Sequence, residues 1–409
     1  MNNIKNVPEI RFKGCYDKDG NWIAFTHPWE QRKLGEIATF INGRAYSQDE
    51  LLNSGKYKVL RVGNFYTNDF WYYSDMELDD KYYAENGDLL YTWSATFGPH
   101  IWHGNKVIYH YHIWKIELSK ALEKNFALQL LERDKQAILS DKNGSTMVHI
   151  TKAGMERKEV LLPKNIVEQV KIGQYFTNLD HLITLHQRKA NAYERFKEGM
   201  VQKLLNQVLR FKADDGSNFP EWEEKKLGEV LEISTETNGN KYNKQDVLSV
   251  SDEYGVVNQI ELQGRSFAGN DISKYKVVKT GQLVYTRSPL AVKPFGIIKR
   301  VGDEIGIVSP LYIVNDVREN NCSMFWYYNF DIPERTNDYL KPLVRMGAKH
   351  TMNISNEEWL SGKVMVPCLA EQQKIAKCLL SLDNVIENQK AKVAVLKKLK
   401  KCMLQKMIV

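Results

Sequence analysis

Near its start the chain reads Trp29-Glu30-Gln31-Arg32-Lys33-Leu34-Gly35-Glu36-Ile37, and 193 residues later it reads Trp222-Glu223-Glu224-Lys225-Lys226-Leu227-Gly228-Glu229-Val230. Six of these nine positions are identical. Three other pairs of segments also match, at offsets between 194 and 203 residues: Ile10–Lys13 with Leu209–Lys212, Gly87–Thr92 with Gly281–Thr286, and Glu168–Asp180 with Glu371–Asp383. A single match of this length can arise by chance, but four in the same order predict a tandem duplication.

Each repeat ends in a stretch with a helical period. In this stretch every third or fourth residue is mostly apolar, and this spacing is that of the a and d positions along the seam of a coiled coil. The strongest seam positions are Ile172, Phe176, Leu179 and Ile183 in the first repeat, and Ile375, Leu379, Leu382 and Ile386 in the second. The first seam continues to Leu204, which makes about 50 Å of helix. Such a seam cannot bury itself, so we expect the two helices to pack together.

Polar residues interrupt both seams at matching positions, His186 with Gln389 and Lys197 with Lys400. A parallel pair in register would bring the two lysines together, and like charges repel across a seam. An antiparallel pair would place each lysine against an apolar layer, with its head reaching water. The sequence therefore favours an antiparallel pair.

The segment before each helix is strand-rich, with β-branched and aromatic runs at 107–116 and 305–314 and shorter helical stretches at 122–139 and 319–330. The turn-rich residues 212–220 separate the halves. The expected organisation is an arm (1–28), a first domain (29–163), a helix (164–206), a linker (207–221), a second domain (222–367) and a second helix (368–409).

The composition is that of a globular protein, with 409 residues, 43% of them hydrophobic and 11% aromatic. No run reaches the roughly 18 apolar residues of a membrane helix, and the first residues lack the apolar core of a signal peptide, so we expect a cytoplasmic protein. The five cysteines form no CxxC pair, which argues against disulfides or a cysteine zinc site. The net charge of +7 mildly favours an anionic partner. Residues 386–409 carry much of this positive charge. They form either a solvated helix face or a surface that contacts DNA phosphates or an acidic protein.

Motifs of catalysis are missing from the sequence. There is no G-x-G-x-x-G, no phosphate-binding loop, no G-x-S-x-G and no Pro-Pro pair of the kind that amino-methyltransferases use. We therefore expect no catalytic residue in this chain. His100, His103, His110 and His112 form one cluster, and His110 and His112 would share one face of a strand. No acidic residue or cysteine lies among them and the second repeat lacks the cluster, so we favour packing or nucleic-acid contact over a metal site.

The chain resembles the specificity subunit of type I restriction–modification systems. The resemblance covers nearly the whole chain and rests on the Trp-x4-Leu-Gly-Glu openings, the Gly-Asp-Leu-Leu and Gly-Gln-Leu-Val turns, and Glu-Gln-x9-Leu-Asp at the head of both helices. It implies an α+β fold: a tandem duplication of a mixed, strand-rich target-recognition domain followed by a long helix, with the two helices packed as an antiparallel coiled coil.

The same resemblance implies a non-catalytic subunit that reads a split sequence in double-stranded DNA, one half with each domain. Two modification (methyltransferase) subunits would dock on the helices, and restriction subunits would add translocation and cleavage. The cofactors S-adenosylmethionine, ATP and Mg²⁺ would belong to those partners, with none in this chain. Because sequence is read at base edges, polar, basic and aromatic residues in loops are the candidate DNA contacts.

In the first domain these candidates are Arg44, Tyr46, Arg61, Asn64, Trp93, Ser94, Lys142, Asn143, Ser145 and Thr146. In the second they are Lys241, Tyr242, Asn243, Arg265, Arg287, Ser288, Lys293, Arg345, Lys349 and His350. We also expect the helices to act as a ruler that fixes the gap between the half-sites. Three alternatives stay open: a stand-alone sequence-specific DNA-binding protein, a metalloenzyme built on the histidine cluster, and a structural coiled-coil adaptor.

Overall fold

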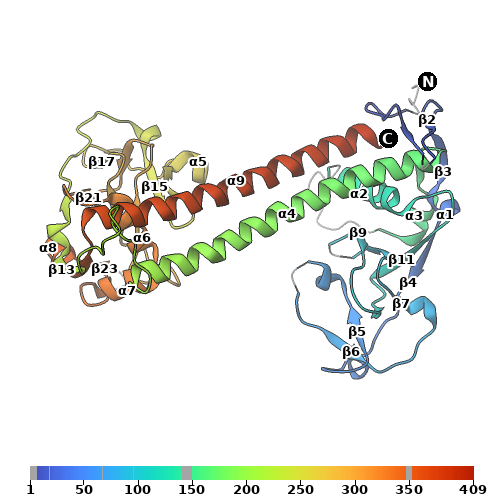
Figure 1. Cartoon of the computed structure of the whole chain (residues 1–409), viewed down its shortest axis with the longest axis horizontal. Coiled ribbons are helices and arrows are strands. Elements are labelled where there is room, and N and C mark those ends of the chain that lie inside the picture. Colours follow the sequence, from blue (N-terminus) through green and yellow to red (C-terminus); the bar gives the residue numbers. More distant parts are fainter. Residues whose placement is uncertain (1–6, 18, 67, 95, 141–149, 347–351) are drawn as a thin grey trace. The chain divides into compact units, whose positions relative to one another are not determined.

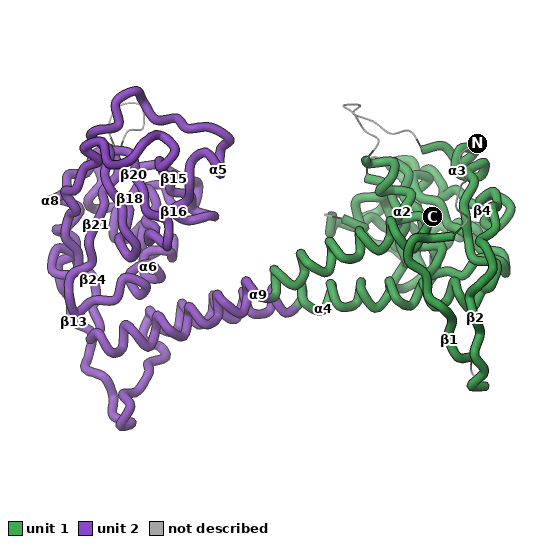
Figure 2. Tube along the Cα trace, turned by 90° about the horizontal axis from the view of Figure 1, so that it is seen from above, with its two compact units in different colours: residues 1–188, 389–409 green, residues 189–388 purple. Residues whose placement is uncertain are grey.

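A computed structural model describes residues 7–17, 19–66, 68–94, 96–140, 150–346 and 352–409. The chain forms two compact units, residues 1–188 with 389–409 (unit 1) and residues 189–388 (unit 2), which Figure 2 shows in two colours. Each unit therefore contains one strand-rich domain and parts of both long helices. In the described residues no helix is long and apolar enough to cross a membrane.

Unit 1 contains two four-stranded sheets, ordered β6-β5-β10-β7 and β4-β11-β8-β9, and two pairs, β1-β2 and β12-β3. Figure 1 shows β5 and β6 at the end of this unit that is remote from α4. The elements are β1 Gly14–Tyr16, β2 Trp22–Ala24, β3 Glu30–Lys33, α1 Leu34–Ile37, β4 Ala38–Asn42, β5 Tyr57–Leu60, β6 Tyr72–Ser74, β7 Tyr83–Ala84, β8 Leu89–Thr92, β9 Gly98–Ile101, β10 Val107–Tyr109, β11 Ile113–Leu118, α2 Lys124–Ser140, α3 Lys152–Arg157, β12 Glu159–Leu162 and α4 Ile166–Leu205.

Unit 2 repeats part of this topology, with the pairs β15-β16 and β17-β20 in place of the sheet β6-β5-β10-β7. Its four-stranded sheet β14-β21-β18-β19 has the order of β4-β11-β8-β9, and β13-β24 corresponds to β3-β12. The elements are β13 Glu223–Lys226, β14 Leu231–Ile233, β15 Leu248–Ser251, β16 Gly255–Asn258, α5 Gln259–Gln263, β17 Lys276–Val278, β18 Leu283–Thr286, β19 Ile297–Arg300, β20 Gly306–Val308, β21 Ile313–Val317, α6 Ser323–Asp331, α7 Pro333–Leu340, β22 Arg345–Met346, β23 Met352–Asn353, α8 Asn356–Ser361, β24 Lys363–Val366 and α9 Leu369–Met407.

The repeated motifs build the base of each domain. Glu168, at the start of α4, is 2% exposed and accepts two hydrogen bonds from Arg11 (2.6 and 2.8 Å) and one from the indole of Trp29 (3.2 Å). Glu371, at the start of α9, holds Arg210 and Trp222 in the same way. The motif that opens each domain is therefore tied to the helix that follows it.

The neighbouring glutamines satisfy buried backbone groups. Gln169 accepts from the amide of Glu123 and donates to the carbonyls of Ala121 and Pro163. Gln372 accepts from the amide of Cys322 and donates to the carbonyl of Pro367. Because an unpaired buried backbone group costs free energy, this glutamine fixes the loop before α2 or α6.

The glycines of the Gly-Asp-Leu-Leu and Gly-Gln-Leu-Val turns also have a shared structural role. Gly87 and Gly281 both have a φ of +91°, a conformation that side chains with a Cβ rarely adopt. Each turn leads directly into the buried central strand of its sheet, β8 or β18.

The apolar seam of each helix is buried mainly where the helix meets its domain. In unit 1, Ile172, Phe176 and Leu179 pack in one core with Leu404 and Met407 of α9, and Ile183 is half-buried. In unit 2, the corresponding core contains Ile375 and Leu379 together with Leu204 of α4. Leu382 packs against that core and Ile386 is buried.

The direction of the helices follows from contacts inside each unit. In unit 1, Asp180 contacts Lys400 and His186 contacts Gln389, so the numbering rises along α4 as it falls along α9. The expected antiparallel arrangement is thus observed. The expected environment of the lysines is wrong, because each meets an aspartate: Lys400 binds Asp180 (2.7 Å), and Lys197 binds Asp383. A carboxylate offsets the cost of placing an ammonium group beside the seam.

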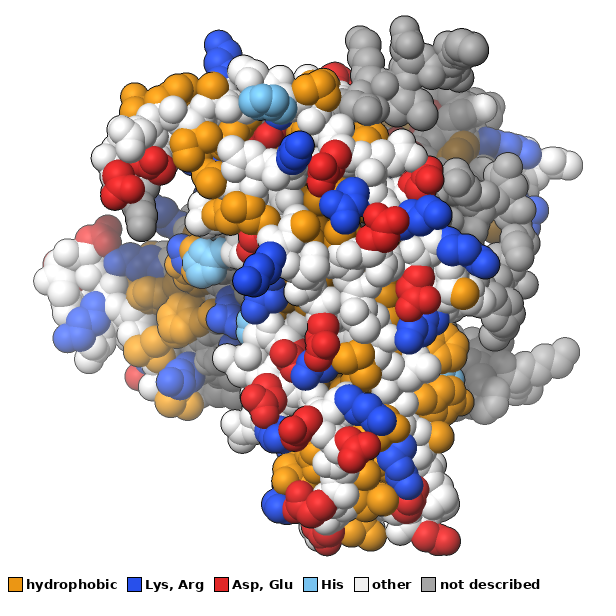
Figure 3. Space-filling model, turned by 90° about the vertical axis from the view of Figure 1, so that its right-hand side faces the viewer, with side chains coloured by type: hydrophobic (Ala, Val, Ile, Leu, Met, Phe, Trp, Pro, Cys, Tyr) orange, Lys and Arg blue, Asp and Glu red, His pale blue; other side chains and the backbone are white. Residues whose placement is uncertain are grey.

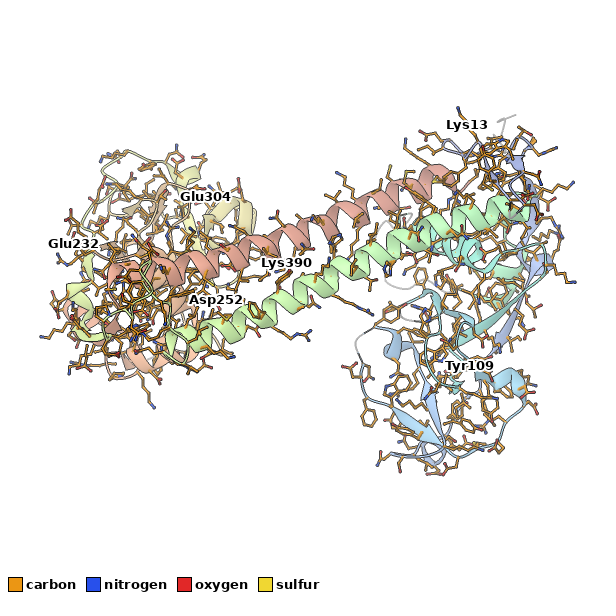
Figure 4. The ribbon with its side chains drawn as sticks, viewed as in Figure 1. Lys13, Tyr109, Glu232, Asp252, Glu304 and Lys390 are labelled. Atoms are coloured by element: carbon orange, nitrogen blue, oxygen red, sulfur yellow. The ribbon has the colours of Figure 1, made fainter. Side chains whose placement is uncertain are left out.

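One strand prediction also needs correction. Residues 107–116 do not form a single strand, because β10 ends at Tyr109 and β11 begins at Ile113. His110–His112 form the turn between these strands, so His110 and His112 do not share a strand face. The corresponding turn in unit 2 lies between β20 and β21. Tyr109 itself is fully buried within the strand-rich part of unit 1 (Figure 4).

Candidate nucleic-acid interface

In unit 1 the candidate residues gather around the His110–His112 turn. Trp93 follows β8, and its indole donates to the carbonyl of Tyr111 (2.9 Å). The Trp93 ring stacks on Trp114 at 5.8 Å and meets the edge of His112 at 5.0 Å. These flat side chains form a surface of the kind on which bases and sugars pack. We call the group Arg44, Tyr46, Arg61, Trp93, His110, Tyr111 and His112 the aromatic cluster.

Arg44 and Tyr46 enter the aromatic cluster from the loop after β4. The backbone of Arg44 pairs with that of His110, and the Tyr46 ring lies 6.4 Å from the His110 ring. Two hydrogen bonds of 2.7 and 3.0 Å join the Arg44 guanidinium to Glu50. This ion pair raises the pKa of Arg44 and lowers that of Glu50 to about 2. The charge of Arg44 is therefore already compensated.

Arg61 follows β5 on the other side of His110. Its guanidinium lies over the ring of Tyr72 at 4.2 Å, and its Nε is buried without a hydrogen-bond partner. Burial, with smaller contributions from His112 and Arg61, lowers the pKa of His110 to about 4. At neutral pH His110 is therefore uncharged, with one nitrogen that donates and one that accepts a hydrogen bond.

Two other candidates in this domain have different surroundings. Asn64 accepts from the amide of Arg61 and donates to the carbonyls of Asn68 and Phe70, so its side chain holds a turn. Ser94 is half-buried beside Trp93. Lys142, Asn143, Ser145 and Thr146 lie outside the described residues, as do Lys349 and His350 of the second domain.

In unit 2, Arg287 and Ser288 follow β18, the strand that corresponds to β8. Arg287 is half-buried and its Nε also lacks a hydrogen-bond partner. Lys276 lies nearby and donates to the carbonyl of Tyr312 (2.6 Å), in the turn that corresponds to His110–His112. Burial, and to a lesser extent Arg287, lowers the pKa of Lys276. This region is the counterpart of the aromatic cluster, with fewer rings.

Lys293 does not lie on the surface. Its side chain is 4% exposed and binds Asp252 at 2.7 Å, and Lys299 binds the same carboxylate at 2.9 Å. Asp331 completes the group, 2.6 Å from Lys299. Figure 4 labels Asp252 in this unit. The ammonium group of Lys293 therefore anchors the loop between β18 and β19 and is not offered to DNA.

The remaining candidates of the second domain are more peripheral. Lys241 is exposed and pairs with Glu236 at 3.0 Å, whereas Tyr242 packs in a small core with Ile272. Asn243 caps a short turn by accepting from the amide of Gln245. Arg265 lies over the Phe267 ring at 4.7 Å, and Arg345 pairs with Glu358 at 2.7 Å.

Some members of these surfaces were not in the two lists of candidate contacts, although packing or nucleic-acid contact was the interpretation favoured for the histidine cluster. His110, Tyr111 and His112 reach the aromatic cluster because they form a turn, whereas the sequence pattern predicted a continuous strand. Lys276, Leu311 and Tyr312 occupy the corresponding region of unit 2, and Leu311 is 70% exposed. The offset of about 200 residues between β10–β11 and β20–β21 was the signal that could have identified them.

Other features of the molecule limit what else it can do. Among the described residues, no three histidine, cysteine or acidic side chains gather as metal ligands would. The face of the molecule in Figure 3 mixes acidic and basic side chains, without a continuous positive field.

Comparison with known proteins agrees with this architecture. The model of the type I restriction modification DNA specificity domain matches twice, at residues 26–195 and 220–398. The chain is 24% identical over 406 residues to the type I restriction enzyme MjaVIII specificity subunit of Methanocaldococcus jannaschii, covering 94% of this chain and 93% of the relative. It is also 24% identical over 422 residues to the putative MjaX specificity subunit of that organism, covering 91% of each.

The fold is also similar to that of a solved protein. The crystal structure of the type I restriction–modification S subunit from M. genitalium matches with a TM-score of 0.60 and 14% identity, over 98% of this chain and 99% of that one. The two family matches, one in each strand-rich half, account for the duplication and for the shared motifs. The chain belongs to the family of type I restriction–modification specificity subunits and carries two recognition domains.

Proposed function

We propose that each domain reads one half of a split DNA target, the first through the aromatic cluster and the second through the region around Arg287. The observation that carries this proposal is that each surface includes the residue that follows the same central strand of the repeated sheet, Trp93 after β8 and Arg287 after β18. Base edges in the major groove offer the donors, acceptors and methyl groups that such side chains distinguish.

We propose further that the helices dock two modification subunits and set the gap between the half-sites. Exposed apolar side chains on the helices support a docking role. In unit 1, Leu182 and Leu185 of α4 and Val395 and Leu399 of α9 are between 36% and 66% exposed. Large apolar side chains exposed together on a helix are typical of a surface that another protein covers.

The chemistry is assigned to those partners. In this proposal the modification subunits bind S-adenosylmethionine and methylate adenines, and restriction subunits use ATP and Mg²⁺. The chain supplies recognition and no catalytic group. Because an adenine must leave the base stack to be methylated, the reader holds the duplex while a partner takes the base.

The test is co-purification of partners together with methylome sequencing of strains with and without the gene. We expect recovery of an adenine methyltransferase and, on deletion, loss of one methylated motif that has two separated halves. Recovery of the chain alone, with an unchanged methylome and tight binding to a defined DNA sequence, would instead support a stand-alone DNA-binding protein.

A further inference from the structure

The candidate arginines of the two domains differ in how their charges are compensated. Arg44 and Arg345 have carboxylate partners at 2.7 Å, and the candidate Lys293 is likewise paired. Within the described residues, Arg61 and Arg287 form no ion pair. Both are half-buried, and each has an Nε that water does not reach and that no acceptor satisfies. Among the described residues, each domain therefore holds one arginine whose Nε is desolvated and has neither a counterion nor an acceptor.

Such an arrangement costs stability in the free protein, because a desolvated donor without an acceptor has lost its hydrogen bonds to water. A ligand cannot reach the buried Nε, but acceptors that it supplies to the terminal amino groups, which are not among the buried atoms, would offset this cost. A guanidinium is a flat fork with parallel N–H groups, and it matches two neighbouring acceptors in one plane. In DNA such a pair occurs on guanine, at O6 and N7, and on the phosphate group.

The surroundings of Arg61 favour guanine over a phosphate group as the ligand of its guanidinium. Its guanidinium lies on the Tyr72 ring at 4.2 Å, which fixes the plane of the fork. His110 beside it is uncharged at neutral pH, and the charge of Arg44 is held by Glu50. Several mobile cations are enough to bind a phosphate group. Recognition of a base edge instead requires one oriented guanidinium among neutral donors, acceptors and rings.

Arg287 has a comparable setting in the second domain. It directly follows β18, whose residues are all buried, so its backbone position is rigid. The adjoining loop is held in place by the ion pair of Lys293 with Asp252 and by two backbone hydrogen bonds between Leu290 and Lys293. Arg61 follows β5 and Arg287 follows β18, so the two arginines are not equivalent in the repeats and would read different positions of their half-sites.

We propose that Arg61 and Arg287 each read a guanine in the major groove, one in each half of the target. This inference rests on the proposed function, since it assumes that the chain directs methylation. The shared ligand chemistry is a pair of coplanar acceptors, and the experiment below separates guanine from phosphate.

The experiment reconstitutes the full chain with its modification subunits in a host free of adenine methylation, followed by single-molecule mapping of methylated sites. The variants are Arg61→Gln, Arg61→Lys and Arg287→Gln. Arg32→Gln and Arg318→Gln serve as controls, because these arginines lie in the same domains but pair with Glu36 and Glu232. Thermal melting of each purified variant establishes that it is folded.

We expect Arg61→Gln to lower the preference for guanine at one position of one half-site by about 5- to 150-fold, with the other half unchanged. Arg287→Gln should do the same in the other half, so that each variant controls for the other. Arg61→Lys should retain part of the preference, because it keeps a positively charged donor group and loses the planar fork. The controls should leave the motif unaltered.

Other outcomes would overturn the inference. A uniform fall in methylation with an unchanged motif would assign these arginines to phosphates, and so would a smaller dependence of DNA binding on salt. A wild-type half-site without any G·C pair, or variants with wild-type specificity, would also exclude it. If wild-type methylation did not depend on the chain at all, the proposed function itself would have failed, which is a different result.

Discussion

His186 of α4 and Gln389 of α9 share a hydrogen bond of 2.7 Å, between Nδ1 and Oε1, although 203 residues separate them. This number is also the offset between the repeated Glu-Gln motifs, so the two residues occupy the same position in their repeats. Equivalent residues also meet in a parallel pair in register, but there Lys197 would face Lys400. Lys400 instead binds Asp180, so the helices run antiparallel. The amide oxygen can only accept, so Nδ1 of His186 carries the proton.

The ion pair between Asp180 and Lys400 allows a test of this helix register. Asp180→Lys places two ammonium groups together and should lower the free energy of unfolding by about 1 kcal/mol, since one half-exposed pair is lost and like charges repel. Adding Lys400→Asp restores the pair with its charges reversed and should recover more than half of the loss. Urea denaturation of both variants measures this. Equal destabilisation by the single and double changes would contradict the observed contact.

Glu371 connects the opening motif of the second domain to α9, and its removal should be costly. Glu371→Gln leaves Arg210 without its buried carboxylate and should lower the free energy of unfolding by about 3 kcal/mol. Glu221 offers a matched control, because it binds the same arginine but is 88% exposed. Glu221→Gln should change stability by less than about 0.5 kcal/mol. Similar losses in both variants would rule out a special role for the buried carboxylate.

Gly296 lies where the loop that follows Arg287 enters β19. Its φ is +104°, and an added Cβ would lie 2.1 Å from the carbonyl oxygen of Thr286. Gly296→Ala should therefore cost at least about 2 kcal/mol. Gly302, just beyond β19, has no atom within 4 Å of an added Cβ, and Gly302→Ala should be nearly neutral. Thermal or chemical denaturation of the two variants measures this difference. A Gly296→Ala variant as stable as the wild type would refute the described turn.

Buried histidines should make the first domain sensitive to acid. Burial, with a smaller contribution from Lys135, lowers the pKa of His100 to about 4, against about 6.5 in an unfolded chain. Between these pH values the unfolded state binds a proton that the folded state does not, so stability is lost as the pH falls through this window. Each such histidine raises the unfolding constant by up to tenfold per pH unit. Urea denaturation between pH 7 and 5 should show that the free energy of unfolding depends less steeply on pH in His100→Asn than in the wild type. Identical slopes in the two proteins would contradict this.

The ruler hypothesis can be tested with the antiparallel register in mind. Seven residues inserted after His186 and seven after Gln389 keep the helical phase in both helices at the point where they meet. Each insertion adds about 10 Å of helix, close to three base pairs. Methylome mapping should then show a longer gap between unchanged half-sites. An unchanged gap would exclude the helices as the ruler.

The candidate contacts illustrate how far sequence reasoning reaches. Trp93 and Arg287 were identified as loop residues, and both follow the central strand of the repeated sheet. Lys293 has the same kind of sequence context but is buried between two aspartates that lie far from it in the chain. A local pattern reports exposure on average and cannot anticipate a distant counterion.

Sequence reasoning alone was enough to predict the duplication and the two long helices, because repeated motifs and a seven-residue period are local properties of the chain. It also favoured the antiparallel direction, but on an apolar environment for Lys197 and Lys400 that the structure corrects. It also identified the Glu-Gln motifs, but not that Glu168 and Glu371 bind an arginine and a tryptophan. The folded structure alone shows which charges are compensated, where β10 ends and β11 begins, and which rings surround Arg61. These features depend on contacts between residues that are distant in sequence, whose geometry is fixed only when the core has packed.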